Sequence, residues 1–503
     1  MDSIQHLIGG LGTALTLQNL FLVIVGVTVG TLVGVLPGLG PSATLALLLP
    51  ITMGFPPEGT LIMMAGLYYG AKYGGSTTAI LLNIPGEAAS VMTTLDGYAL
   101  AKQGRAGPAL GIAAISSFIA GIVGVIGLTL FAPVVAGLAI KFGPPEMFGL
   151  MMFGLTTIIL LAGESVLKGL LAAALGLLLS TIGSDVVSGQ ARFVFGQIEL
   201  LDGIDFIIVA VALFAVTEVL ANVGRPGESE IFTAPTKFRE MLPSRQDMKD
   251  SRFAFGQSSV IGFFIGCLPG AGSTIASFIS YGVQKKFSPN KDKFGKGAID
   301  GVAAPEGANN SETGGAMVPL LTLGIPGSAS TAIMLAALIL YGFQPGPQLF
   351  AEQSDLVWAL IASMFVGNVI CVILNLPLVP LFASILKLPY VYLYPLILVI
   401  SLIGVYALSF SEYDLIIFLA FIVLGYLLRL GDVPIAPLVL AFVLGPMAER
   451  SLSQSLVISN GNPLILIERP IAAVLLTLAV ALFIASVVGR GDHVRKKVLE
   501  EEL

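Results

Sequence analysis

The sequence predicts an all-α integral membrane protein with about 10–12 transmembrane helices and additional re-entrant or broken half-helices. Two features of the composition indicate this class. Of the 503 residues, 55% are hydrophobic and 11% are charged, whereas soluble domains carry about 25% charged residues and cannot hide so much apolar surface. Glycine (59 residues) and proline (29 residues) are abundant, which in a lipid-embedded chain indicates close helix packing and interrupted helices.

The third feature is a set of long apolar runs, which are candidates for membrane-crossing helices because a crossing takes about 20 residues. They are Asn19–Val35, Ala109–Ile140, Met147–Ala162, Leu167–Ile182, Phe206–Val223, Leu356–Leu386, Tyr390–Phe410, Leu415–Leu428 and Leu464–Val488. The second run is longer than a simple span needs, which suggests a tilted helix. The sixth contains Pro377 and Pro380, either of which can break or kink a helix.

Shorter apolar segments lie between some of these runs, and three of them are followed directly by Pro-Gly. The segments are Pro41–Met53, Leu61–Tyr69, Ser76–Ile84, Val260–Leu268, Thr274–Val283, Met317–Ile325 and Ser330–Tyr341. Each is too short to cross a bilayer alone. Short segments interrupted by glycine and proline are typical of half-helices and re-entrant hairpins in transporters.

The two halves of the sequence resemble each other. Leu36–Gly40 matches Leu268–Gly272, Asn83–Ser90 matches Gly324–Thr331, and Arg105–Leu110 matches Gln344–Leu349, in the same order. We therefore predict a two-fold internal repeat, which we expect to be inverted. The predicted organisation is a first membrane repeat at 1–223, a basic cytoplasmic linker at 224–257, a second membrane repeat at 258–489 and a cytoplasmic tail at 490–503.

The predicted inverted repeat and the positions of the basic segments imply different numbers of membrane crossings. Inverted repeats require an odd number of crossings in each half. The basic linker and the basic tail both have the character of cytoplasmic segments, which implies an even number between them. Either one re-entrant segment is miscounted or one basic segment is periplasmic.

Residues for catalysis or for cofactor binding are scarce. The two cysteines, Cys267 and Cys371, lie inside apolar runs, and the two histidines, His6 and His493, lie near the termini. These residues cannot form a disulfide framework or a catalytic metal site. The P-loop, HExxH, CxxC and GxSxG patterns are also absent. We therefore expect no enzyme activity and no cofactor. A bound Na⁺ or a coupling H⁺ is the one kind of ion that we expect the protein to use.

Three segments form the candidate substrate-binding site. The first opens two of the short helices and contains Pro37, Gly38, Gly40 and Ser42, with Gly270, Ser273 and Thr274 in the second half. A loop that opens a half-helix exposes backbone N–H groups, which favour an anion. The alternative is a turn that only packs two helices together.

The second segment surrounds Lys72. An ionisable residue between apolar segments is a functional candidate, and it can pair with a carboxylate, whereas the alternative is a snorkelling or loop lysine. The hydroxyl groups that follow it can bind a substrate or only link helices. The candidate residues here are Lys72, Gly75, Ser76, Thr77, Asn83, Pro85 and Gly86.

The third segment is the most polar one beside short apolar runs. Its candidate substrate-binding residues are Asn309, Asn310, Ser311 and Thr313, followed by Gly327 and Ser328. Neutral amides and hydroxyls can coordinate sodium or bind carboxylates. Glu306, Glu312 and Asn310 are the candidates for cation coupling. The alternative is a solvent-exposed loop.

Taken together, these motifs resemble the large membrane subunit of the bacterial tripartite tricarboxylate transporters. The motifs are Leu36–Pro41, Tyr73–Ser76, Asn83–Gly86, Asn310–Gly315 and Gly324–Gly327, and the resemblance extends over essentially the whole chain. It implies a multi-pass secondary transporter of the bacterial inner membrane that works with a small membrane subunit and a periplasmic solute-binding protein. It further implies uptake of citrate-like tricarboxylates or related organic carboxylates by symport with protons or sodium.

We expect the short hairpins to meet near the membrane midplane and one bundle to move as a rigid body against the longer helices, as in an elevator-like transporter. An ion channel or an organic-anion carrier that needs no binding protein is the alternative. A membrane-embedded enzyme is disfavoured, because an enzyme has no need of duplicated half-helices.

Overall fold

The computed structural model describes residues 2–36, 40–52, 54–161, 165–185, 189–222, 238–270, 272–384 and 390–484. Pro37 and Gly38 of the candidate site lie outside these residues. The chain divides into two compact units: unit 1 comprises Met1–Ala139 and Ile207–Tyr426, and unit 2 comprises Ile140–Phe206 and Leu427–Leu503. Each unit takes segments from both halves of the sequence, so the division does not test the predicted repeat boundaries.

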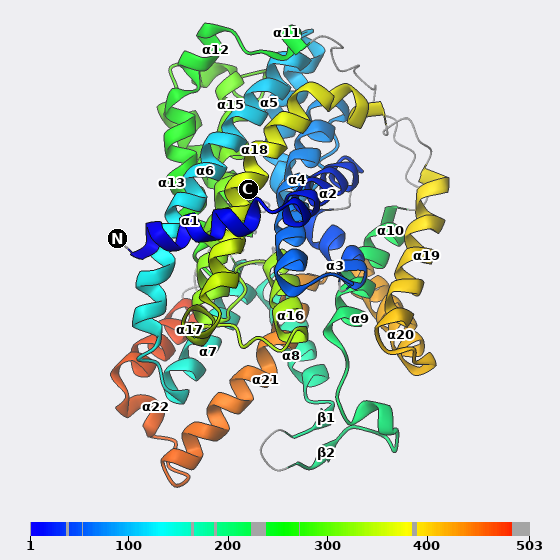
Figure 1. Cartoon of the computed structure of the whole chain (residues 1–503), viewed down its shortest axis with the longest axis vertical. Helices are drawn as coiled ribbons and strands as arrows, with labels where there is room; N and C mark the ends of the chain where they lie inside the picture. Colours follow the sequence, from blue (N-terminus) through cyan, green and yellow to red (C-terminus); the bar gives the residue numbers. More distant parts are fainter. Residues whose placement is uncertain are drawn as a thin grey trace, which may run out of the picture. The chain divides into compact units, whose positions relative to one another are not determined.

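Unit 1 is helical throughout its described part (Figure 1). Its α-helices are α1 (Asp2–Ala14), α2 (Leu17–Gly34), α3 (Pro41–Thr52), α4 (Pro57–Leu82), α5 (Val91–Lys102), α6 (Ala106–Ala139), α9 (Phe206–Ala210), α10 (Thr217–Asn222), α11 (Phe238–Met241), α12 (Arg245–Asp250), α13 (Arg252–Gly266), α14 (Gly272–Phe287), α15 (Ile299–Leu323), α16 (Ala329–Leu340), α17 (Pro347–Glu352), α18 (Ser354–Ser384), α19 (Tyr390–Ser409) and most of α20 (Glu412–Leu430). Two 3₁₀ turns, η1 (Ala88–Ser90) and η4 (Lys291–Lys293), and a π-helical stretch, η3 (Val211–Val216), complete it.

Unit 2 combines helices with a small hairpin. Its elements are α7 (Pro144–Leu161), α8 (Val166–Ser180), β1 (Gly183–Ser184), β2 (Ala191–Arg192), the 3₁₀ turn η2 (Ile198–Leu200), α21 (Ile435–Ile458), α22 (Ile465–Glu468) and a last helix, Pro470–Ile484. The strands pair antiparallel, with Gly183 opposite Arg192 and Ser184 opposite Ala191.

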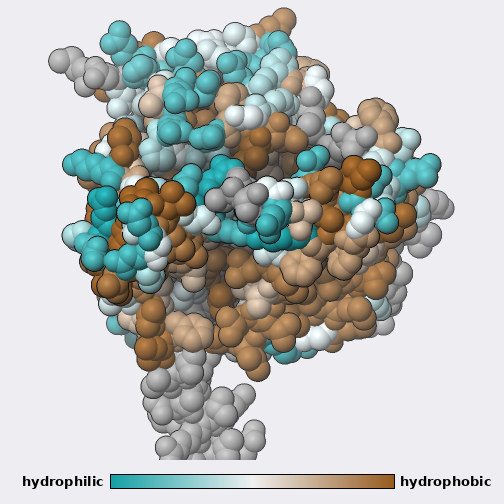
Figure 2. All heavy atoms as spheres, turned by 90° about the horizontal axis from the view of Figure 1, so that it is seen from below, coloured by the Kyte–Doolittle hydropathy of each residue, from teal (hydrophilic) through white to brown (hydrophobic). Residues whose placement is uncertain are grey.

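Five of the described helices are long and apolar enough to cross a membrane: α2, α6, α18 over Ser354–Val379, α20 and α21. Large apolar side chains point outward from them, such as Leu130 of α6 and Ile416 of α20. Brown, apolar atoms accordingly cover much of the face drawn in Figure 2. The all-α membrane class is confirmed to this extent, and the expected total of about 10–12 crossings stays a prediction.

Helices α2 and α4 pack with their backbones very close together. A Cβ atom on Gly30 of α2 would lie 2.4 Å from the carbonyl oxygen of Leu67, and one on Gly70 of α4 would lie 2.3 Å from that of Val27. Only a residue without a side chain permits this approach. Small residues at a helix contact are the usual way in which helices associate in lipid.

This packing corrects one expectation from the sequence. Leu61–Tyr69 and Ser76–Ile84 were expected to be two short segments joined by a glycine-rich loop, but α4 runs through both without interruption. The prediction was wrong because the glycines between them make room for α2 and do not break the helix. Tertiary contacts here outweigh the low helix propensity of glycine.

The polar stretch Pro305–Gly315 is also helical and not a loop, since it lies together with Met317–Leu323 in the buried helix α15. Three serine hydroxyls donate to its carbonyl oxygens: Ser116 to Ala303 (2.6 Å), Ser280 to Ala304 (2.8 Å) and Ser277 to Pro305 (3.1 Å). Hydroxyl groups of α6 and α14 thus bond to the backbone of α15 and link it to these neighbouring helices. The alternative of a solvent-exposed loop is therefore excluded.

Helices α13 and α15 repeat the close packing of α2 and α4. A Cβ atom on Gly262 would lie 2.4 Å from the carbonyl oxygen of Ala308, and one on Gly266 would lie 2.4 Å from that of Glu312. Both helix pairs thus use glycines on the first helix to bring the second helix against its backbone.

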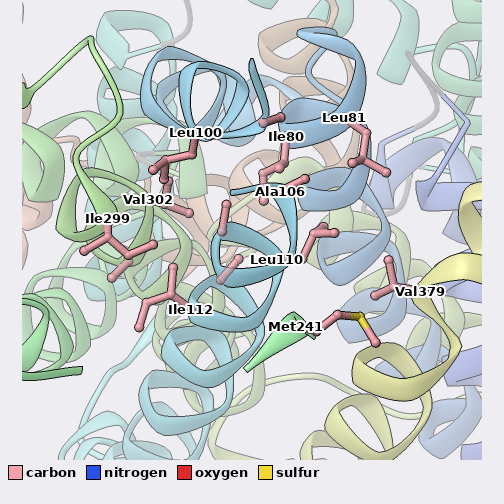
Figure 3. Packing of buried hydrophobic residues seen from close by; sticks show 14 of the residues in the cluster. Ile80, Leu81, Leu100, Ala106, Leu110, Ile112, Met241, Ile299, Val302 and Val379 are labelled. Atoms are coloured by element: carbon pink, nitrogen blue, oxygen red, sulfur yellow. The ribbon is translucent and has the colours of Figure 1, made fainter. Parts of the chain in front are cut away.

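An apolar cluster lies beside the polar centre of unit 1 and holds its helices together (Figure 3). Ile80 and Leu81 of α4, Leu110 of α6 and Val302 of α15 belong to it. In a lipid environment such side chains contribute through close van der Waals packing and not through removal from water. This cluster fixes α4, α6 and α15 relative to one another, and these helices carry the polar residues described next.

Candidate substrate site

Lys72 forms a buried ion pair where α4 meets α15. Its ammonium group is fully buried and donates to Glu312 Oε2 (2.7 Å) and to the backbone oxygen of Asn309 (2.6 Å). The ring of Tyr68, one turn earlier on α4, lies 4.8 Å from the ammonium nitrogen, and its hydroxyl donates to the same Glu312 oxygen (3.3 Å). The expected carboxylate partner of Lys72 is thus Glu312, and complete burial excludes a snorkelling or loop lysine.

Glu306 lies one to two turns before Glu312 on α15 and is held differently. Ser76 donates a short hydrogen bond to Glu306 Oε2, and Thr93 of α5 donates to Oε1 at 2.5 Å. The side chain is fully buried, and within the described part of the chain no basic group forms an ion pair with it. The partners of the Glu306 carboxyl group are therefore two hydroxyl groups.

Two asparagines extend the polar cluster to other elements. Asn309 Nδ2 donates to Glu87 Oε1 (2.7 Å), which lies just before η1. Asn310 Nδ2 donates to Ser117 Oγ of α6 (2.8 Å) and to the backbone oxygen of Glu306 (3.1 Å). The cluster therefore joins α4, α5, α6 and α15 around one centre.

Several buried oxygens of α15 have no hydrogen-bond partner among the described residues. They are Asn309 Oδ1, Asn310 Oδ1, Glu312 Oε1 and Thr313 Oγ1. Residues three and four apart share one face of a helix, so the oxygens of Asn309, Glu312 and Thr313 belong to the same face. A buried acceptor without a partner costs about 1–3 kcal/mol, and a bound ligand or cation would remove that cost.

The structure brings together six of the residues selected from the sequence. Lys72, Ser76, Glu306, Asn309 and Glu312 are in direct contact as described, and Ser328 reaches the cluster through a 3.3 Å contact with the hydroxyl of Tyr68. Asn310 joins them through Ser117, and Thr77 and Thr313 are buried on the same two helices.

The other selected residues shape the surrounding backbone. Gly86 and Gly327 lie in the two Pro-Gly turns, where a Cβ atom would be 2.8 Å from the carbonyl oxygen of Gly34 and 3.0 Å from that of Gly266. Gly270 N donates to the backbone oxygen of Gly327 (3.0 Å). Pro85 is half-buried in the first turn.

Some selected residues lie further from the cluster. Asn83 is exposed and ends α4 in a left-handed conformation (φ 58°), and Ser311 bonds the backbone oxygen of Ser259 (2.6 Å) in the α13 contact. Ser42, Ser273 and Thr274 are half-buried in the first turns of α3 and α14. Gly40 and Gly75 both lie close to Glu87, since a Cβ atom on either would be 3.5–3.6 Å from its side chain.

Comparison with known proteins identifies the family. The model of the tripartite tricarboxylate transporter TctA family matches residues 20–440, which include every group of the polar cluster. The chain belongs to the TctA family. This is a family of membrane transporters, and its tripartite character implies partner subunits.

Two curated relatives of this TctA chain come from Agrobacterium vitis. One is an uncharacterized 52.8 kDa protein in the 3′ region of ttuC′ in TAR-I, 45% identical over the full length of both chains. The other is an uncharacterized protein in the 3′ region of ttuC′ in TAR-II, 43% identical over 48% of this chain and all of its own length. No solved structure matches the chain significantly.

Four residues of the polar cluster were not selected from the sequence. Tyr68 precedes Lys72 by one helical turn, a spacing that could have indicated it. Glu87 follows the Asn-Ile-Pro-Gly motif directly. Thr93 and Ser117 carry no such signal, because only the fold brings α5 and α6 to the carboxylate and amide of α15.

Proposed function

We propose that this chain is the transmembrane transport subunit of a binding-protein-dependent, cation-coupled system that takes up tricarboxylates or related organic carboxylates. It works in the bacterial inner membrane with a small membrane subunit and a periplasmic solute-binding protein. The observation that carries the proposal is the buried Lys72–Glu312 pair beside unpartnered oxygens. Ionisable side chains inside a membrane protein usually mark the path of a substrate or ion.

Lys72 is the partner of one substrate carboxylate. In the structure Glu312 holds this position, so that Lys72 is not left as an uncompensated buried charge. An incoming carboxylate replaces Glu312 at the ammonium group. The unpartnered oxygens of Asn309 and Thr313 accept hydrogen bonds from hydroxyl or protonated acid groups of the substrate.

Charge balance explains why a cation accompanies the substrate. The cluster contains one cation, Lys72, and three carboxyl groups, Glu87, Glu306 and Glu312. Adding a substrate carboxylate increases the negative excess, and uncompensated charge is costly away from water. Protons or sodium ions must therefore bind together with the anion.

Glu306 is the proposed proton carrier. Its partners Ser76 and Thr93 are hydroxyls, which can both donate and accept a hydrogen bond. The carboxyl group can therefore gain or lose a proton without losing its partners. Sodium is the alternative coupling ion, for which the unpartnered Glu312 Oε1 is a proposed ligand.

The predicted inverted repeat belongs to this proposal. In support, Gly86 approaches the carbonyl oxygen of Gly34 as Gly327 approaches that of Gly266. The contacts between α4 and α15 also run in opposite order, since Lys72 meets Glu312 whereas Ser76 meets the earlier residue Glu306. An elevator-like movement would then carry this site across the membrane.

Uptake of labelled citrate into proteoliposomes containing both membrane subunits and supplied with the binding protein tests the function. We expect uptake to collapse when the proton and sodium gradients are dissipated, and persistence would instead favour a channel or facilitator. Replacing Lys72 by Met should lower uptake about 100-fold, the equivalent of about 2.7 kcal/mol. The exposed Lys102 provides the matched control, K102M.

The single variant K72M leaves Glu312 buried and unpaired, which can destabilise the fold by about 3–5 kcal/mol. The double variant K72M/E312Q removes both charges and should therefore insert and fold normally while uptake stays lost. Parent-like citrate uptake by this double variant would show that Lys72 does not bind the substrate.

A further inference from the structure

An extramembrane segment of unit 2 combines features that the transport site does not explain. It follows α8 and contains β1, β2 and η2; we call its described residues, 181–185 and 189–205, the hairpin segment (Figure 1). Its two strands form an open two-stranded sheet with irregular backbone on either side. Open sheet edges and irregular loops do not lie exposed in the hydrocarbon of a bilayer, so the segment lies outside it.

The order of elements assigns the segment to the outer side of the membrane. From Phe206 to Asn222, α9, η3 and α10 run without interruption, a length of about 25 Å at 1.5 Å per residue. This length approaches the thickness of the hydrocarbon core. The chain then enters the basic stretch that includes Arg239 and Arg245, which the positive-inside rule places in the cytoplasm. The hairpin segment therefore faces the opposite compartment.

The segment exposes a group of large apolar side chains. Phe195 and Ile198 are each 79% exposed, and Phe193 is 54% exposed. Both phenylalanines adopt a left-handed backbone conformation, with φ of 52° at Phe193 and 49° at Phe195. Bulky residues rarely take this conformation, and such strain tends to occur at functional positions.

The exposed side chains are held on an ordered support. Arg192 makes a two-pronged ion pair with Glu449 of α21, at 2.5 and 3.1 Å, and a further one with Asp185 at 3.3 Å. The backbone N–H of Ser184 donates to the oxygen of Leu201 (2.9 Å). A surface that is already ordered loses little conformational entropy when a partner binds.

We propose that the hairpin segment is a docking surface for an extramembrane protein whose contact surface is apolar with a basic rim. The exposed acidic residues Glu199 and Asp202 accompany the apolar group. This charge complements a basic rim and would be repelled by an anionic lipid surface. The inference rests on the proposed function, because the soluble binding protein is the partner present on this side.

Binding of the purified solute-binding protein to the full chain in nanodiscs tests the surface directly. We expect Phe195→Gly to weaken binding at least about tenfold, because it removes the ring. The same change relieves the backbone strain, so thermal stability should stay equal or rise. Charge reversal in E199K/D202K should also weaken binding, and the parent's affinity should fall with added salt. Phe410→Gly is the matched control, since Phe410 is 73% exposed with φ 53° in unit 1.

If F195G and E199K/D202K both bind the solute-binding protein with the parent's affinity, the hairpin segment is not the docking surface. Citrate uptake by the parent would in that case show that the proposed transport function still holds. Failure of the parent both to bind the protein and to transport would overturn the two proposals together. Membrane contact is measured separately with F195W and brominated lipids, against the parent with its single tryptophan. Strong additional quenching would place the segment in lipid and contradict docking.

Discussion

At the scale of single residues, the two glutamates of α15 have different partners and therefore suit different roles. Glu312 faces the ammonium group of Lys72, which compensates its negative charge. Glu306 faces the hydroxyls of Ser76 and Thr93, which compensate no charge but adapt to either protonation state. The environment of each carboxyl group thus separates a substrate-exchange role from a proton-carrying role.

Replacing Glu306 by Gln should uncouple uptake from the proton gradient. Glutamine retains the size of the side chain and can accept a hydrogen bond from Ser76 and donate one to Thr93, but it cannot take up a proton. We expect gradient-driven citrate accumulation to fall about tenfold or more, the loss typical of removing one charged partner. Exchange of internal for external citrate, which needs no net proton movement, should continue.

The charged and titratable groups around Glu306 define the control for this experiment. They are Lys72 and Tyr73 on α4, Glu87 before η1 and Glu312 on α15; α6, which packs against α15, contains none. Glu58 in the first turn of α4 is exposed and lies outside this cluster, so E58Q serves as the matched substitution. An E306Q variant that accumulates citrate in response to a proton gradient like the parent would exclude Glu306 as the carrier.

At the scale of secondary-structure elements, glycine decides whether the polar residues meet. Gly70 lies two positions before Lys72 on α4 and packs directly against α2. The distance between α2 and α4 at Gly70 therefore determines where the ammonium group of Lys72 lies. The close contacts of α13 with α15 position Glu312 in the same way, since its carbonyl oxygen lies against Gly266. The ion pair thus depends on two glycine-mediated helix contacts.

Replacing Gly70 by Ala should therefore destabilise unit 1. The added Cβ atom would lie 2.3 Å from a backbone carbonyl oxygen of α2, which cannot rotate away, and such overpacking costs about 1–3 kcal/mol. Thermal unfolding of the purified protein in detergent measures the effect as a lower melting temperature. At Gly256 of α13, no atom lies within 4 Å of the position that a methyl group would take, so G256A should be neutral or slightly stabilising. Equal melting temperatures for both variants would contradict this account of the packing.

The same elements show what the sequence could and could not predict. Short helices that follow Pro-Gly motifs in the sequence, such as α3 and α16, follow from their length and flanking residues. Lys72 was recognisable because a charge interrupts an apolar stretch. The break expected between Leu61–Tyr69 and Ser76–Ile84 was wrong, because a glycine that permits packing and a glycine that ends a helix look alike in a sequence. The role of Thr93 depends on a contact between elements remote in sequence, which no local pattern encodes.

At the scale of the whole molecule, the number of crossings determines which segments face which side of the membrane. From the sequence alone, the inverted repeat and the two basic segments imply different numbers of crossings. Helix α4 is one helix and not two short segments, and α15 joins the polar stretch Pro305–Gly315 to Met317–Leu323. The count of crossings changes accordingly. The antiparallel order of their contacts agrees with an inverted arrangement of the two halves. The sidedness of the linker and of the hairpin segment then provides a fixed reference for every other element.

Cysteine labelling can establish this reference. In a C267A/C371A background, which removes both native thiols, a single cysteine at Phe195 should react with a membrane-impermeant maleimide in spheroplasts, whose inner membrane is intact. A cysteine at the exposed Gln246 of α12 should react only after the membrane is permeabilised, because the basic stretch around it is retained in the cytoplasm. Labelling of both positions from outside would mean that Phe206–Asn222 does not cross the membrane, and the assignment of the hairpin segment to the outer side would fail with it. Opposite accessibility would fix one crossing between them, and the number of crossings from α13 onward could then be counted from a known side.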